Sequence, residues 1–583
     1  AITFSVWFAI FGDFFAGQPA MTQHGLDYYL IVKYQMDNLM RGVFPFWDPL
    51  MFWGRPDNID SRFIGEFNPF LWVYAVLAWV GVPRPTAFLV YALGYHFIGL
   101  AGFCLLAQRI FKDALLAWLS FTLFLFSSFV ILVFNNYCVT LMTVPMIWFF
   151  YFFVAFTQTP KKVFFAGLIF SVMLLAITYM PFYFLTIFVV ILAAFSLLYP
   201  TQVPIIIKKW SKFTINNKYF IILGSICVIF SLIPGIQWFL ASESGEYILS
   251  WRHTGSNSLN AAAMELSTIS TSGIVGPVDL KRLFSGLQNS RHLLFFVPLF
   301  VYVILLVSLV NRVTKLSLVF LLSGLVIFLI TLTDLTPVHK FLYEHIYFYK
   351  LFRNIFYFSY MALIPLIILF VVEQLRLFLE DTKKENNRTL LMVFAVLVHG
   401  LFALFLYKMG NITWSSYVSL FLSLVFFLGY LAGFRAPGAG TLPGWVILLL
   451  AAAVVVQPAE VFYHYKKNAL SVVDWSPKDR FYPKFSFVRP TRQQEAQAPK
   501  CYKGKSPQAV QDTSGFEPWK YTGLNRSYLL HQNVAHDVLE EYVKYKFVVY
   551  DTVEVIGEEG WDFKRFEQTI RQKENKAFVF LVS

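Results

Sequence analysis

The sequence is short of charged residues. Only 14% of its 583 residues are Asp, Glu, Lys or Arg, whereas soluble proteins average about 25%. By contrast, 57% of the residues are hydrophobic. This balance excludes an ordinary soluble globular protein and predicts a polytopic membrane protein, in which most side chains face lipid or other helices.

Cysteine and the common catalytic motifs are also scarce. The four cysteines have no metal-type spacing, so the sequence predicts neither a disulfide framework nor a zinc site. It contains no Gly-rich phosphate loop, HExxH, GxSxG or paired CxxC motif. Nucleotide-driven transport and zinc hydrolysis are therefore unsupported, and these motifs indicate no cofactor.

Long apolar runs dominate what is present. A bilayer core needs about 20 apolar residues per helix, and about thirteen runs approach that length. They are Ile2–Phe15, Pro85–Ala107, Ala114–Phe134, Leu141–Thr157, Val163–Thr178, Pro181–Tyr199, Tyr219–Ala241, Leu293–Val310, Leu316–Thr333, Ile355–Val372, Leu390–Tyr407, Tyr417–Phe434 and Trp445–Phe462. The expected fold is an all-α polytopic membrane protein with about thirteen transmembrane helices.

Positive charge in the connecting loops predicts the topology. The loops on one face carry 15 Lys and Arg residues, whereas the short loops on the other face carry none. The positive-inside rule assigns the first set to the cytoplasm. Topology thus explains the net charge of +13 without a nucleic-acid partner. The outer face then receives a first loop (residues 16–84), a second (242–291), a distal loop (334–354) and the tail (464–583).

One apolar stretch of the first outer loop, Phe67–Val82, is short and bounded by prolines. If it crossed the membrane, the first helix would have to start outside to keep the charge bias. The sequence therefore predicts a re-entrant or interfacial hairpin here.

The tail, residues 464–583, differs in composition from the transmembrane body, residues 1–463. It is charged and rich in turn-forming residues, and it is long enough for a small domain. Its pattern predicts an extended segment over Ser471–Tyr521. It also predicts helices over Val534–Tyr545 and Asp562–Lys573 and strands over Phe547–Val555 and Ala577–Val582. We expect a small extracytoplasmic α/β domain.

The candidate acidic groups lie at or near the first outer loop. Asp27 precedes an amphipathic run, where it is a general base, the N-cap of a helix over Tyr28–Met40, or both. Asp13, at the outer end of the first helix, is the alternative base. Asp57 and Asp60 could ligate a divalent metal such as Mg or Mn, or could form a turn beside Pro56.

Candidate cations lie in the later outer loops. Lys350 and Arg353 directly precede an outer-face helix, and Arg252 lies in the second loop. An Arg can bind a phosphate through two parallel hydrogen bonds. The alternative role for these side chains is to reach lipid headgroups at the membrane surface. His399 lies within an apolar run and is interpreted as a core histidine.

The order of several short motifs resembles the first outer loop of bacterial YfhO-type membrane proteins of the GT-C superfamily. The motifs are Asp27-Tyr28-Tyr29, Gly42-Val43-Phe44-Pro45-Phe46-Trp47-Asp48-Pro49, Gly54-Arg55-Pro56 and Asn68-Pro69-Phe70, followed in the distal loop by Thr336-Pro337 and Phe352-Arg353-Asn354. The resemblance covers the membrane body and implies a GT-C-like fold in the bacterial cytoplasmic (inner) membrane. It also implies a polyprenyl-phosphate-linked sugar donor, with Asp27 in the position of the base.

Three functions stay open on the sequence. The first is a membrane glycosyltransferase that uses the lipid-linked donor on the outer face. The second is a non-catalytic GT-C-like assembly subunit whose tail binds protein partners. The third is a transporter, which is disfavoured because the predicted helices have almost no charged residues near their middles.

Overall fold

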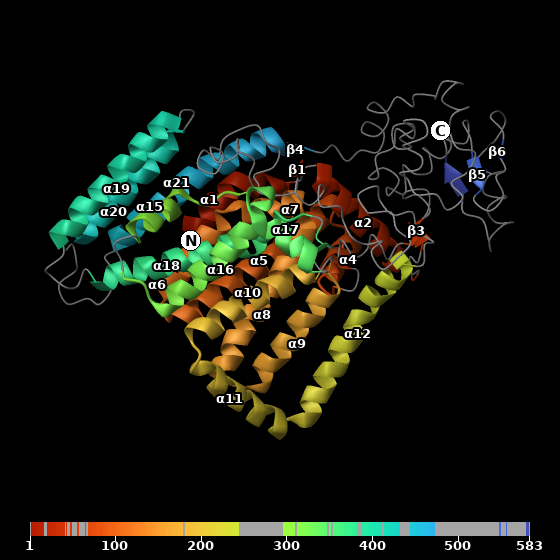
Figure 1. The fold of residues 1–583 in the computed structure, drawn as a ribbon. Coiled ribbons are helices and arrows are strands. Elements are labelled where there is room, and N and C mark those ends of the chain that lie inside the picture. Colours follow the sequence, from red (N-terminus) through yellow and green to blue (C-terminus); the bar gives the residue numbers. More distant parts are fainter. Residues whose placement is uncertain are drawn as a thin grey trace.

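The computed structural model describes residues 2–16, 20–21, 23–40, 42, 47–48, 55–56, 65, 68–178, 181–243, 295–308, 312–346, 349–350, 352, 354–381, 388–409, 413–431, 444–472, 547–549, 555–556 and 579–581. Within these ranges the protein is mainly helical (Figure 1).

Every predicted apolar run contains a helix. The helices of the body are α1 (Ile2–Phe11), α2 (Gln23–Met40), α4 (Leu71–Trp79), α5 (Arg84–Phe111), α6 (Ala114–Leu125), α7 (Leu132–Asn135), α8 (Tyr137–Gln158), α9 (Lys162–Ala176), α10 (Phe182–Leu198), α11 (Gln202–Asn216), α12 (Lys218–Glu243), α15 (Leu299–Val307), α16 (Lys315–Thr331), α17 (Pro337–His345), α18 (Ile364–Asp381), α19 (Arg388–Met409), α20 (Trp414–Leu431) and α21 (Gly444–Ala469). Short turns of 3₁₀-helix are η1 (Gly12–Ala16), η2 (Ser128–Ile131) and η3 (Thr333–Leu335), and η5 (Ser359–Leu363) is a π-helical turn before α18.

Six of the described helices are long and apolar enough to cross a membrane, and the number reaches eight if two bent helix pairs each count as one span. Shorter apolar helices accompany them, including Lys162–Ala176 and Lys315–Thr331. The chain is thus a helical protein with several segments suited to a bilayer. The larger number of thirteen crossings remains a prediction.

Two of the apolar stretches do not form one straight membrane-spanning helix. The run Ala114–Phe134 bends by 50° between α6 and η2. Ser127 causes the break, because its hydroxyl donates to Phe124 O at 2.7 Å and accepts from Phe129 N at 3.3 Å. Within Phe67–Val82 the helix α4 has nine residues, a length of about 14 Å. It is too short to span a bilayer, which agrees with the predicted hairpin.

The centre of the body is formed by close packing of α5 on α8. A Cβ on Gly99 of α5 would lie 2.7 Å from Cγ2 of Val144, so a larger residue would force Val144 or the two helices to shift. Nearby, Trp148 Nε1 donates to Ile98 O at 3.1 Å. Small residues that let two helices approach closely are typical of helix pairs in membranes.

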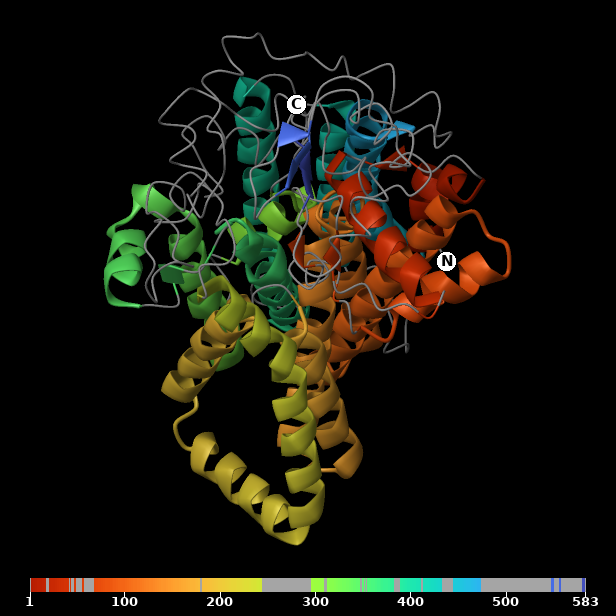
Figure 2. The ribbon, with the colours of Figure 1, turned by 90° about the vertical axis from the view of Figure 1, so that its right-hand side faces the viewer.

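The helix ends gather at two opposite ends of the body (Figures 1 and 2). The loop end carries α2, α4, α17 and the start of α18. The basic end carries α11, the turn between α8 and α9, the start of α16 and the end of α18. Helix α11 was predicted to be a loop, Pro200–Lys218, because its three lysines and two nearby prolines hide its periodicity.

The strands are short. In the first outer loop β2 (Trp47–Asp48) pairs with β3 (Arg55–Pro56), and β1 (Ala20–Met21) pairs antiparallel with β4 (Ser471–Val472) at the start of the tail. In the tail, β5 (Phe547–Val549) pairs antiparallel with β6 (Val555–Ile556) and β7 (Val579–Leu581). These strands fall within or beside the two predicted ones. The predicted tail helices Val534–Tyr545 and Asp562–Lys573 lie outside the described residues.

Candidate functional site

Asp27 lies inside helix α2. The helix starts at Gln23, four residues before Asp27, so the prediction that Asp27 caps a helix over Tyr28–Met40 is wrong. The Asp27 side chain lies outside the described part of the chain. The next residue, Tyr28, points inward, where its hydroxyl donates to Cys138 Sγ at 3.0 Å.

A tyrosine cluster, formed by Tyr28, Tyr91, Tyr137 and Tyr357 around Cys138, lies beneath α2. Tyr137 donates a hydrogen bond to Tyr91, and the ring of Tyr28 meets that of Tyr137 edge-on at 6.2 Å. Cys138 Sγ lies 4.0 Å from the hydroxyl of Tyr357, two residues before the π-helical turn η5. The cluster therefore links helix α2 to the segment between the distal loop and α18.

The segment around Arg353 is fixed from the other side by α10. The hydroxyl of Tyr183 donates to Asn354 O at 3.0 Å and accepts from Asn354 N at 3.1 Å. The Tyr183 ring also packs on Phe352, with ring centroids 4.6 Å apart. Both chain neighbours of Arg353 are thus anchored on Tyr183. Arg353 itself lies outside the described residues.

Lys350 is described, and its amino group lies 5.3 Å from the ring centroid of Tyr343. This cation–π contact holds the lysine against α17. The other predicted phosphate ligand, Arg252, and the predicted metal ligands Asp57 and Asp60 lie outside the described residues. In the part of the chain that the structure describes, no group of three or more His, Cys, Asp and Glu residues could hold a metal ion.

A second polar group of the distal loop was not found from the sequence. His339 of α17 is fully buried, and its Nδ1 lies 2.7 Å from the hydroxyl of Tyr349. Its Nε2 lies 3.9 Å from Oδ1 of Asp334. Burial lowers the pKa of His339 and the carboxylate of Asp334 opposes this shift, while burial raises the pKa of Tyr349. A neutral imidazole that accepts from Tyr349 and carries its proton on Nε2 fits these contacts.

Backbone strain accompanies this group. Thr333, directly before Asp334, has φ +46°, a left-handed conformation that a β-branched residue rarely adopts. Thr336 then donates to Leu329 O at 3.1 Å and leads into Pro337, the first residue of α17. The Thr336-Pro337 motif therefore sets the position of the helix that carries His339.

Asp13, the alternative base, is paired in the structure. Lys466 of α21 places its amino group 2.6 Å and 2.5 Å from the two carboxylate oxygens and 2.6 Å from Ile10 O. The same amino group lies 5.4 Å from the ring centroid of Phe14. The ion pair joins η1, directly after α1, to α21, and a catalytic role for Asp13 would require it to open.

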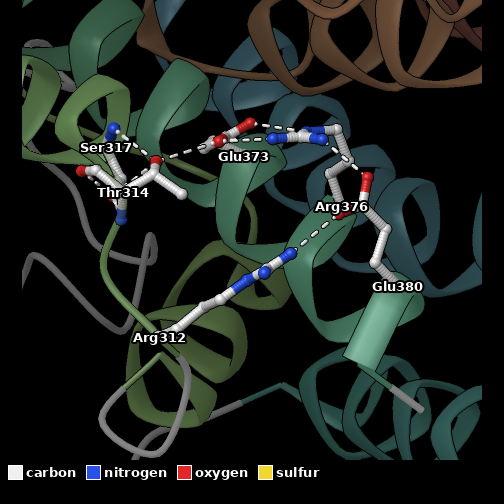
Figure 3. A network of polar contacts seen from close by, with 6 residues as sticks. All are labelled: Arg312, Thr314, Ser317, Glu373, Arg376 and Glu380. Carbon is white, nitrogen blue, oxygen red and sulfur yellow. Dashed lines mark hydrogen bonds and ion pairs between the residues drawn. The ribbon is translucent and has the colours of Figure 1, made fainter. Parts of the chain in front are cut away.

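A larger ionic network lies at the basic end (Figure 3). The side chain of Glu373 in α18 is fully buried and accepts from Arg376 Nε and Nη2, both at 2.8 Å. Arg376 also reaches Glu380 at 2.6 Å, and Glu380 accepts from Arg312 at 3.0 Å. Thr314 donates to Glu373 at 3.1 Å. Such a fully hydrogen-bonded buried charge suits a structural tie.

Thr314 connects this network to α16. Its hydroxyl accepts from Ser317 N at 3.1 Å, and Ser317 Oγ accepts from Thr314 N at 2.9 Å, which forms a capping box. The sequence contained a signal for this network, because Glu373, Arg376 and Glu380 have the spacing of residues on one face of a helix.

The candidate site is thus the loop end, where α2, the tyrosine cluster and the segment before α18 meet. Compared with known proteins, the chain matches no family model, and no curated protein shows significant similarity to it.

Proposed function

We propose that the protein is a membrane glycosyltransferase that transfers a sugar from a polyprenyl-phosphate donor to an acceptor on the outer face of the bacterial cytoplasmic membrane. One observation carries the proposal: Cys138 contacts Tyr28 and Tyr357 at 3.0 Å and 4.0 Å. Tyr28 follows Asp27, and Tyr357 is four residues from Arg353. The candidate base and the candidate phosphate ligand therefore come from segments that meet at one residue.

In the proposed reaction the acceptor hydroxyl attacks the anomeric carbon of the donor sugar. The new bond forms between the acceptor oxygen and this carbon, the bond to the phosphate oxygen breaks, and Asp27 takes the acceptor proton. Polyprenyl phosphate leaves, and Arg353, Lys350 and Arg252 stabilise the charge on its oxygens. Asp57 and Asp60 are the candidate ligands for Mg²⁺ or Mn²⁺, whose preference for oxygen they meet.

The pairing of β1 with β4 supports placing the tail on the same side as the first outer loop, because it pairs Ala20 of that loop with Val472 of the tail. The ion pair of Asp13 with Lys466 lies at the same end. The proposal therefore includes thirteen crossings and an extracytoplasmic tail with a small α/β domain, which is free to bind protein partners.

Asp27→Asn tests the base. The amide keeps the size of the side chain and removes its basicity, and helix α2 needs no cap at this position. Because general-base catalysis contributes typically ~10²–10⁴-fold, the variant should bind donor and lose most turnover. The measurement is release of polyprenyl phosphate by the purified full chain supplied with a lipid extract that contains polyprenyl-linked sugars. Turnover at the parental rate would remove Asp27 from the mechanism.

Arg353→Lys tests the phosphate contact with a separate measurement. A lysine retains the charge but not the two-pronged geometry of the guanidinium, so binding of undecaprenyl phosphate should weaken on the order of tenfold. Native mass spectrometry of the purified chain with undecaprenyl phosphate reports this directly. Lys340→Gln, an exposed lysine of α17, is the matched control and should bind as the parent does. If no variant changes binding or turnover, the non-catalytic assembly subunit becomes the better account.

A further inference from the structure

Helix α11 lies across the basic end of the body (Figures 1 and 2). It follows α10 after a bend of 118°, so it runs across the direction of the helices suited to span the bilayer. Its inner face packs on the last turns of α8 and the first turn of α9. The Trp210 ring meets Phe153 edge-on at 5.4 Å, and Phe213 meets Phe156 edge-on at 4.9 Å.

The rest of its surface combines lysines with exposed isoleucines. Lys208, Lys209 and Lys212 are all exposed. Ile205, Ile207 and Ile215 are exposed as well, at 49%, 56% and 74%. A helix surface with both kinds of side chain suits the boundary between headgroups and acyl chains, where apolar groups enter the lipid and lysines extend to the phosphates.

The positive charge at this end has few counterions in the chain. From Ala114 to Ser242 the sequence contains six lysines and neither Asp nor Glu. The salt bridges among the described residues, including the network of Glu373, Arg376, Glu380 and Arg312 at this end, do not engage the three lysines of α11. Such a surface attracts an anionic partner from outside the chain.

The neighbouring turn extends the same surface. Lys161 and Lys162 are exposed between α8 and α9, directly beside the rings that hold α11. Arg109, at the end of α5, donates to Thr159 at 3.2 Å and lies 5.0 Å from the ring centroid of Phe164. Basic side chains from the end of α5 and the start of α9 thus lie near α11 at one level of the body.

We propose that α11 and the α8–α9 turn form a binding surface for anionic phospholipid headgroups. The isoleucines enter the outer part of the acyl layer, and Lys208, Lys209 and Lys212 contact the lipid phosphates. This inference is independent of the sugar-transfer reaction, because the surface lies at the end of the body opposite the candidate site. Attraction of basic segments to anionic lipid operates within a Debye length of the membrane, so it weakens with salt.

The test uses the purified full chain in vesicles of phosphatidylcholine containing a minority of phosphatidylglycerol. Spin-labelled forms of the two lipids report the fraction that is immobilised on the protein. The parent should prefer phosphatidylglycerol, and the triple variant K208Q/K209Q/K212Q should reduce that preference by at least about threefold. The matched variant K208R/K209R/K212R keeps the charge and should keep the preference. Lys340→Gln at the loop end should also leave it unchanged.

An unchanged preference in the glutamine variant overturns the proposal. Thermal unfolding in one detergent checks that all variants are folded, which is expected because the three side chains are exposed. If the glutamine variant keeps its lipid preference but loses a cross-link to an acidic protein in native membranes, the surface belongs to a protein partner instead. Raising the salt concentration should reduce the parent's preference and have little effect on the glutamine variant.

Discussion

At the scale of single residues, His339 holds two parts of the distal loop together. Its imidazole joins α17 to Tyr349, and Tyr349 packs edge-on against Phe352 at 5.5 Å. Phe352 in turn contacts Tyr183, which anchors Asn354. His339 is therefore a positioning residue for the segment that carries Arg353, although it lies well before that segment in the sequence.

The pKa of His339 predicts a stability that depends on pH. Burial lowers this pKa below the ordinary value of about 6.5, so between the two values the unfolded chain binds more protons than the folded one. Stability is then complete above about pH 6.5 and falls as the pH drops through 6.5 towards the folded pKa. His339→Asn retains an acceptor for Tyr349 and cannot titrate, so the midpoint of thermal unfolding should depend less on pH between neutral and mildly acidic conditions.

Tyr349→Phe is the companion variant, since it removes the hydroxyl and leaves Nδ1 of His339 without this partner. It should destabilise the protein at neutral pH by about 1–2 kcal/mol while the pH dependence persists. Equal pH profiles for the parent and His339→Asn would show that His339 does not control the acid sensitivity.

Single-residue predictions from the sequence succeeded where burial alone decides. His399 was predicted to be a core histidine and is buried, with Nδ1 2.7 Å from Ala395 O. The His339–Tyr349 contact could not be foreseen, because it depends on the strained turn at Thr333. The exposed pairing of Asp13 with Lys466 spans almost the whole body, and no local pattern signals a partner that far away in the chain.

At the scale of elements, apolar length predicted the helices of the body but not their ends. Amphipathic helices were harder to predict, since lysines and prolines are also common in loops. Helix α11 was assigned to a loop for this reason, and α2 was expected to start five residues later than Gln23. The break in the run Ala114–Phe134 required a side chain, Ser127, to replace backbone hydrogen bonds.

The contribution of the buried Glu373–Arg376 ion pair of α18 to the free energy of unfolding can be measured directly. Glu373→Gln removes the negative charge between Arg376 and Thr314, which leaves a guanidinium only partly compensated. We expect a loss of about 2 kcal/mol in the free energy of unfolding, reduced from fully buried cases because Arg376 is partly exposed. Thermal unfolding of the purified chain in one detergent provides the comparison.

The matched control for that element is Glu380→Gln. Glu380 contacts both Arg376 and Arg312, but its side chain is 40% exposed, so the loss should stay below about 1 kcal/mol. If both substitutions cost the same, burial of Glu373 would not be what makes its charge important.

At the scale of the whole molecule, loop charge predicts which side each end of the body faces. The proposed topology places Cys501 of the tail outside, whereas Cys104 lies within α5, which is suited to span the membrane, and Cys227 lies within the apolar helix α12. A membrane-impermeant thiol reagent applied to intact cells should label the parent and leave Cys501→Ser unlabelled. Labelling that requires permeabilised cells would invert the topology and place the candidate site in the cytoplasm.

The contact of α1 with α21 has a consequence for how the body is made. The partner that neutralises Asp13 and covers Phe11 and Phe14 is synthesised more than 400 residues later. In the proposed topology, α1 therefore lacks this partner until α21 has been synthesised. The packing of α1 against α21 is then a late folding event. Chains that stop before α21 would leave this surface of α1 uncovered and open to wrong contacts.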